Sequence, residues 1–283
     1  MKSLQKIFLS LLLIPLLSSG LFGCASQTTK SGLVGVQRSQ LLIVSEKEME
    51  QNAEKAYAQI LTKAKKSGTL NPDPKMTARV RAIAKRLIPQ TAVFRKDAPK
   101  WDWEINVIDS PELNAWCMPG GKIVVYSGII KKLKLTDAEL AAIMGHEIAH
   151  ALREHGRERA SEAMLKQFGL QAVALGTGIK GPYLDAVNLI TDVTFTLPFS
   201  RIHEREADRI GVELAARAGY NPFAAVKVWE KMSKIAKNAP PELLSTHPSN
   251  KSRMKDLQKF AQKVYPLYVE ACKKLGISPQ PPK

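Results

Sequence analysis

Long apolar runs, internal repeats and nucleic-acid-binding motifs are all missing from this 283-residue sequence. The apolar run at residues 7–17 is shorter than the roughly 20 residues that a membrane-spanning helix needs. Basic residues outnumber acidic ones, 42 against 26, but they are scattered, and no helix-turn-helix, zinc-knuckle or RNP-like pattern accompanies them. We therefore expect no nucleic-acid partner, and we interpret the net charge of +16 as a basic surface beside an anionic membrane.

Cysteine is scarce, with three residues in the chain: Cys24, Cys117 and Cys272. Cys24 ends the sequence Leu-Phe-Gly-Cys, which resembles a bacterial lipobox, and the short apolar run before it is typical of a signal peptide. We therefore predict a lipoprotein signal peptide at residues 1–23 and acylation of Cys24. An ordinary signal peptide followed by an incidental cysteine is the alternative.

The residues after Cys24 indicate the compartment. Ala25 stands where some bacterial lipoproteins have aspartate, which indicates sorting to the outer membrane. We expect the protein to be lipid-anchored on the periplasmic side of that membrane. Residues 24–40 are polar and are predicted to form a flexible tether. In this oxidising compartment a disulfide between Cys117 and Cys272 is possible.

Periodicity and capping signals predict one mostly helical α+β domain with a small sheet. A serine cap, early glutamates and late lysines predict a helix at residues 45–66. Further helices are expected at 76–87, 137–154, about 199–218, 222–236 and 251–275, and strands at 101–108, 114–118 and 122–127. No linker divides residues 41–275, so we predict a single domain at 41–283.

The most informative motif is the sequence His146-Glu147-Ile-Ala-His150, inside a strongly helical stretch. Residues four apart leave one face of a helix one turn apart, so both imidazoles can bind one tetrahedral Zn²⁺. Glu147 lies off that line, where it can accept a proton from a metal-bound water. A surface helix with two solvated histidines is the alternative. His155, just beyond the motif, is interpreted as a histidine at a helix end.

Catalytic zinc needs a third protein ligand and an open position. Glu204 and Asp208 are four residues apart on a second predicted helix, so one carboxylate can bind the metal while the other orients a ligand imidazole. His203 is a competing ligand that lacks an acid four residues on. Glu206 is expected on another face of the helix, as a surface charge.

Three motifs in order make the chain similar to a known family. The HExxH motif, the spaced pair Glu204 and Asp208, and the sequence Thr-His-Pro at residues 246–248 resemble the gluzincin family of the CaaX prenyl protease, HtpX, Oma and BepA–LoiP type. Asn114-Ala115, followed by Pro-Gly-Gly and a strand, is similar to the same family. The resemblance covers about residues 70–260 and implies a zincin-like metallopeptidase domain around an HExxH helix.

The resemblance also implies roles for individual residues. His146, His150 and Glu204 would be the zinc ligands, with Glu147 as the catalytic base.

Other residues would support this centre. Asp208 would contact a ligand histidine, and Arg253 would lie beside the loop of His247. His247 itself would lie near the metal, either as an oxyanion helper or as an inhibitory fourth ligand. Asn114 and Ala115 would lie on an edge strand that holds the backbone of the substrate.

Departures from the family pattern narrow the resemblance. No transmembrane helices follow the motifs, and only 30 residues follow Arg253, too few for a helical-repeat domain. The chain therefore looks most like the LoiP type. We expect a lipid-anchored zinc endopeptidase that cleaves misfolded or stalled outer-membrane proteins, which would be its partners.

Two other functions remain open. A zinc-containing periplasmic chaperone or assembly factor would bind the same unfolded chains without cutting them, although it would have no need of Glu147. Peptide deformylases combine HExxH with an upstream cysteine, a position that Cys117 could fill, but their other motifs are absent.

Overall fold

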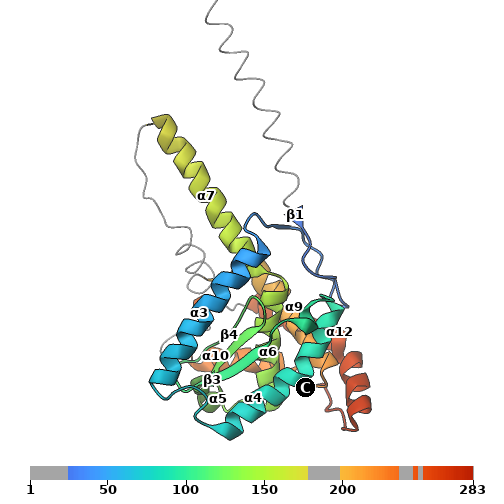
Figure 1. Cartoon of the computed structure of the whole chain (residues 1–283). Coiled ribbons are helices and arrows are strands. Elements are labelled where there is room, and N and C mark those ends of the chain that lie inside the picture. Colours follow the sequence, from blue (N-terminus) through green and yellow to red (C-terminus); the bar gives the residue numbers. More distant parts are fainter. Residues whose placement is uncertain (1–24, 178–197, 236–244, 248–250, 283) are drawn as a thin grey trace, which may run out of the picture.

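The computed structural model describes residues 25–177, 198–235, 245–247 and 251–282 (Figure 1). Helices dominate them and surround a small sheet. The α-helices are α3 (Glu46–Lys66), α4 (Pro74–Leu87), α5 (Ser127–Lys132), α6 (Asp137–Leu152), α7 (His155–Thr177), α9 (Arg201–Arg217), α10 (Ala224–Ile235) and α12 (Lys251–Leu275), with 3-10 helices η2 (Ile88–Val93) and η3 (Ala98–Lys100). The predicted α+β, mostly helical fold is confirmed.

The sheet has the strand order β3-β5-β4. Strand β3 (Glu104–Ile108) is parallel to β5 (Lys122–Tyr126), and β4 (Ala115–Met118) is antiparallel to it. The first strand begins three residues later than predicted, because its partner β5 begins at Lys122, which pairs with Glu104. Before the strand, the Trp103 indole donates a hydrogen bond to the Ala98 carbonyl of η3, at 2.8 Å. The turn before β5 needs Gly121, whose φ is +86° and whose added Cβ would lie 2.7 Å from the Trp103 ring.

Helix α6 runs through the core. Thr136 and Glu139 form a capping box at its start, and every residue from Glu139 to Leu152 is buried. It crosses α9 at two glycines: an added Cβ on Gly145 would lie 2.8 Å from the Gly211 carbonyl oxygen, and one on Gly211 would lie 2.7 Å from the His146 nitrogen. The two backbones therefore touch directly beside the HExxH motif.

The predicted tether instead packs on the domain. Residues 25–41, which we call the amino-terminal strap, contain β1 (Ala25–Ser26) paired antiparallel with β2 (Gln40–Leu41). Between these strands, Val34 and Val36 are each 3% exposed. The prediction of a flexible tether is therefore wrong for residues 25–40, because their polar groups find buried partners that composition alone does not reveal.

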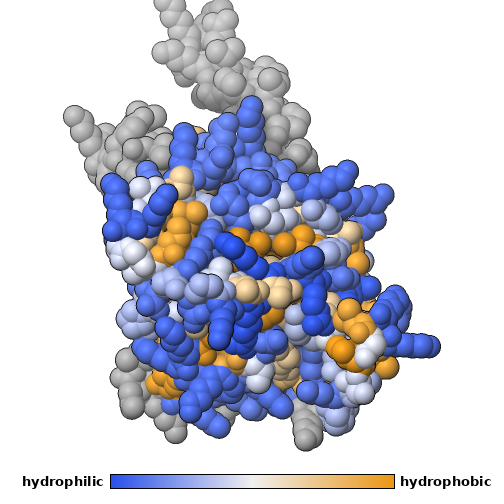
Figure 2. Space-filling view, turned by 60° about the horizontal axis from the view of Figure 1, so that its bottom comes forward, coloured by the Kyte–Doolittle hydropathy of each residue, from blue (hydrophilic) through white to orange (hydrophobic). Residues whose placement is uncertain are grey.

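Figure 2 shows a mostly hydrophilic face with apolar areas between the polar side chains. Among the described helices, none is both long and apolar enough for a membrane span. The predicted signal peptide and Cys24 lie outside the described residues.

Cys117 and Cys272 are free thiols, so the possible disulfide is not formed. Their elements are kept apart, because β4 packs on α6, α6 on α9, and α9 on α12.

Candidate metal centre

Two histidines of the HExxH motif converge in the core. Helix α6 turns His146 and His150 to the same side, where their Nε2 atoms are 3.1 Å apart. They are 7% and 4% exposed, so the alternative of solvated surface histidines is wrong. Burial holds the pKa of His150 well below its usual value, which keeps the imidazole neutral and its lone pair available to a metal.

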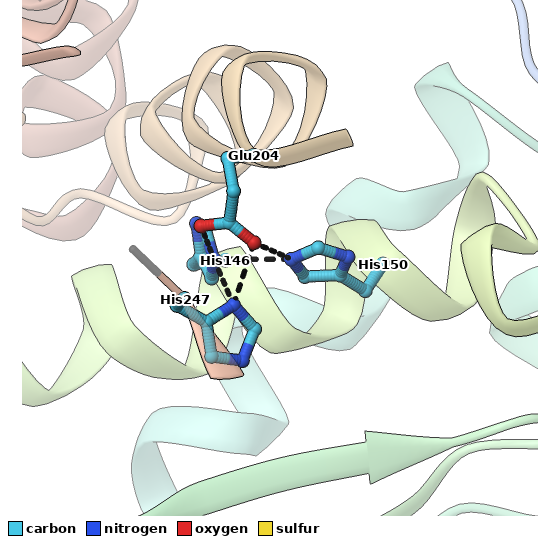
Figure 3. A group of neighbouring side chains, drawn as sticks. All are labelled: His146, His150, Glu204 and His247. Atoms are coloured by element: carbon cyan, nitrogen blue, oxygen red, sulfur yellow. Dashed lines mark hydrogen bonds and ion pairs between the residues drawn. The ribbon is translucent and has the colours of Figure 1, made fainter. Parts of the chain in front are cut away.

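Two more donor groups complete the cluster (Figure 3). Glu204, from α9, places Oε1 3.4 Å from His150 Nε2 and Oε2 3.6 Å from His146 Nε2. His247 places Nδ1 2.8 Å from Glu204 Oε1 and 3.2 Å from His146 Nε2. All four donor atoms lie within 4.8 Å of one another, and all four residues are buried.

The chemistry of these donors fits one zinc ion. Imidazole nitrogens and a carboxylate oxygen are ligands that zinc takes in proteins. Beside them, Glu147 is 4% exposed, and its Oε1 has no hydrogen-bond partner among the described residues. A buried carboxylate oxygen without a partner is costly unless a further group, such as water, meets it. Burial raises the pKa of Glu147, although the nearby imidazoles of His247 and His146 oppose this.

Asp208 and Arg253 lie behind His146. Asp208 Oδ1 is 3.0 Å from His146 Nδ1, the nitrogen that faces away from the cluster. Arg253 binds Asp208 through two nitrogens, at 2.6 and 2.7 Å, and its Nη1 is 2.5 Å from Glu204 Oε2. Burial favours a higher pKa for Asp208, but Arg253 and His146 outweigh it and lower the pKa. The guanidinium also lies 4.1 Å from the centre of the Trp229 ring, which supports it from the other side.

His150 has an equivalent support that the sequence analysis missed. His155 Nδ1 lies 2.9 Å from His150 Nδ1, and His155 Nε2 lies 3.0 Å from Glu206 Oε2. The interpretation of Glu206 as a surface charge is wrong, since it is 7% exposed. His203 faces Glu158 instead, at 3.1 Å, and is not among the four converging residues. Glu154 has a left-handed φ of 51°, which turns the chain between α6 and α7 and brings His155 back to α6. Nothing in the sequence marks this turn, because glutamate rarely adopts that conformation.

A cleft of about 250 Å³ opens beside the cluster. Ala115 is the first residue of β4, and Asn114 directly precedes it. One edge of β4 pairs with β5, while the other pairs with no strand in the described part of the chain. The Phe199 ring packs on His150 with 4.0 Å between ring centres and an angle of 34° between the rings. The Phe199 backbone nitrogen donates to the Thr246 carbonyl, at 2.9 Å. The cleft is lined by Asn114, Ala115, Trp116, Cys117, Met118, Glu147, His150, Phe199, Thr246 and His247, among others.

Comparisons with known proteins agree with this geometry. The chain is 41% identical to the mitochondrial metalloendopeptidase OMA1 of Arabidopsis thaliana over 54% of this chain and 30% of that protein. It is 32% identical to bovine OMA1, over 79% of this chain and 44% of the relative. It is 29% identical to the beta-barrel assembly-enhancing protease of Escherichia coli K12, over 72% of this chain and 43% of the relative. The chain thus spans less than half the length of each of these relatives.

The family model for peptidase family M48 matches residues 74–261. This range contains the HExxH helix, Glu204, His247 and Arg253, and peptidases of the family use zinc. The chain belongs to peptidase family M48.

Proposed function

We propose that this protein is a zinc metalloendopeptidase in which His146, His150 and Glu204 hold one metal ion. The observation that carries the proposal is the convergence of these three residues beside a buried Glu147 whose Oε1 has no partner among the described residues. When bound, zinc makes water a stronger nucleophile and polarises the carbonyl of the substrate. The protein supplies the ligands, the base and a dry surrounding.

Glu147 is the group that moves the proton. It follows His146 on α6, and its Oε2 lies 3.8 Å from His247 Nε2, so it is beside the four converging donors without being one of them. It accepts a proton from the attacking water and then passes it to the amine that leaves the cleaved peptide bond. Its raised pKa suits this exchange, because a very weak base would not take the proton.

The substrate backbone is proposed to lie along β4. The free edge of β4 offers hydrogen-bonding groups to an extended peptide, and the cleft at this edge reaches Glu147 and His150. Asn114 and Ala115 stand where that strand begins. Binding through backbone groups suits a peptidase that accepts unfolded chains of varied sequence.

His247 is proposed to control the site. Its Nδ1 is 2.8 Å from Glu204 Oε1, a position that supports the role of inhibitory fourth ligand. Its Nε2 is 3.8 Å from Glu147 Oε2, which supports the other role, a donor to the oxyanion. Burial acts to lower the pKa of His247, but the carboxylates of Glu204 and Glu147 outweigh it and raise that pKa.

We further propose that the protein is lipid-anchored through Cys24 in the bacterial envelope and cleaves misfolded or stalled outer-membrane proteins. The lipobox-like sequence and the likeness to a beta-barrel assembly-enhancing protease support this setting. The relatives also include mitochondrial metalloendopeptidases, which are consistent with the same chemistry in a different compartment.

The test compares zinc content and cleavage of unfolded casein in wild type and Glu147→Gln. We expect Glu147→Gln to keep one zinc per chain and to lower kcat by about 10²–10⁴-fold, because the amide cannot accept the proton. Glu162→Gln, an exposed glutamate on α7, is the matched control and should retain full activity. Unchanged cleavage by Glu147→Gln would contradict the mechanism, and a wild type that protects casein from aggregation without cutting it would favour the chaperone function.

A further inference from the structure

The amino-terminal strap is held on the domain by specific contacts. Lys30 N donates to the Phe94 carbonyl at 2.8 Å, and Val34 N donates to Glu213 Oε2 at 3.0 Å. Gly32 fits between Phe94 and Glu213 with a φ of +58°, and an added Cβ would lie only 2.5 Å from the Phe94 ring. The strap therefore has one defined position against η2 and α9.

A fully buried arginine links the strap to the core. Arg153 follows α6 directly, and its side chain is 0% exposed. Its Nε and Nη2 each donate to Glu206 Oε2 at 3.1 Å, and Nη2 also donates to the Arg38 carbonyl at 3.0 Å. In return, the Gln40 side chain donates to the Arg153 carbonyl at 2.6 Å. A buried guanidinium is costly without such partners, and the strap supplies several of them.

Arg38 of the strap joins two buried carboxylates. It forms an ion pair with Glu158 Oε1, donates to Glu158 Oε2 at 2.8 Å, and donates from Nε to Glu206 Oε1 at 2.9 Å. Burial favours a higher pKa for Glu158, but the bonds from Arg38, His203 and Gln40 outweigh it and lower the pKa to about 2. Both carboxylates are thus held by a residue that we had predicted to lie in a flexible tether.

From Glu206 the contacts continue to the metal cluster. A metal ligand that uses Nε2 carries its hydrogen on Nδ1, so His150 donates to His155 Nδ1 across 2.9 Å. His155 then carries its own hydrogen on Nε2 and donates to Glu206 Oε2 across 3.0 Å. With Glu206 Oε2 as the acceptor, this arrangement of the two hydrogens satisfies both bonds. The strap residue Arg38 holds the Glu206 carboxylate in place through its donation to Oε1.

We propose that the amino-terminal strap completes the metal centre, with Arg38, Glu206 and His155 acting as positioning residues for His150. The proposal rests on the zinc site put forward above. On the other side of the cluster, Arg253 and Asp208 hold His146 in the same manner. Each histidine of the motif is therefore oriented by a carboxylate that an arginine holds. For His146 the contact with Asp208 is direct, and for His150 the contact with Glu206 runs through His155.

The experiment measures zinc affinity by competition with a chelator, together with kcat, KM and Tm, in the full chain. Loss of a residue that orients a metal ligand typically weakens binding by about 10–100-fold. We expect about 10-fold weaker zinc binding in His155→Leu, a smaller loss in Arg38→Met, and a lower kcat with unchanged KM in both. His155→Gln should recover much of the affinity, because its amide keeps one donor and one acceptor.

The matched control is Arg79→Met. The Arg79 side chain is 32% exposed and pairs with Asp137, much as the 31% exposed Arg38 pairs with Glu158, but it contacts neither the strap nor the cluster. We expect a smaller change in Tm than in Arg38→Met, because Asp137 is 61% exposed, and no change in zinc affinity.

Two outcomes would overturn the proposal: wild-type zinc affinity in His155→Leu, or equal losses of affinity in Arg38→Met and Arg79→Met. Failure of the underlying zinc site would look different. Full zinc content in Glu204→Ala would refute the ligand assignment itself, whereas loss of zinc in Glu204→Ala with no effect in His155→Leu would refute the strap proposal alone.

Discussion

Replacing Gly211 with alanine tests whether the contact between α6 and α9 sets the geometry of the metal cluster. The added Cβ would lie 2.7 Å from the His146 nitrogen, whereas ordinary contacts begin at 3.4 Å, so the helices must separate by about 0.7 Å. Metal-ligand distances tolerate about 0.2 Å. Because Glu204 is on α9 and both histidines are on α6, the separation should impair zinc binding strongly.

The effect on stability should be smaller. Overpacking a core costs about 1–3 kcal/mol, while replacing a helical glycine with alanine returns about 1 kcal/mol of helix propensity. The net loss is therefore about 0–2 kcal/mol in the free energy of unfolding of the metal-free protein, measured by urea denaturation. Zinc affinity, measured by chelator competition, should fall at least about 10-fold.

The matched control is Arg205→Ala, an exposed position on the same helix. It should change neither quantity beyond about 0.5 kcal/mol. A Gly211→Ala protein with higher stability and unchanged zinc affinity would refute the reasoning, because the helices would then have room that the structure does not show.

Three other predictions concern control, anchoring and redox state. His247→Ala should raise basal cleavage if His247 is an inhibitory ligand and lower kcat by about 10²–10³-fold if it is an oxyanion donor; kinetics and zinc affinity equal to wild type would contradict both roles. Cys24→Ser should move the protein from membrane to soluble fractions, because acyl chains contribute about 0.8 kcal/mol per buried CH₂; unchanged membrane association would contradict acylation. Non-reducing mass spectrometry should find Cys117 and Cys272 as free thiols, and a linked peptide would contradict the structure.

Local sequence signals predicted most of the helices, although not α5 or α7, and most of the cluster. The spacing of His146 and His150 is a property of one helix, and Glu204 and Asp208 share a face of another, so helical periodicity was sufficient to group them. Residue His247 could be placed only through resemblance. No local rule brings it to α6, because 101 residues separate it from His146.

Long-range pairing explains what the sequence analysis missed. Glu206 does leave α9 on a different face from Glu204, as periodicity predicts, but α7 and the strap cover that face. We predicted a flexible strap from its polar composition. Composition shows that Arg38 and Gln40 are polar, but it does not show which residues they bind. Those partners, Glu158 and Glu206, follow more than 100 residues later.

Together with the proposed acylation of Cys24, the ordered strap would limit where the peptidase can work. Strand β1 begins at Ala25, one residue after the proposed site of acylation. With Cys24 acylated as proposed, the ordered part of the chain would begin one residue after the lipid. The cleft would then be held at a fixed distance from the bilayer, and this distance would determine which substrates it reaches. It would cut chains that project from the membrane by that distance and spare those that stay within it.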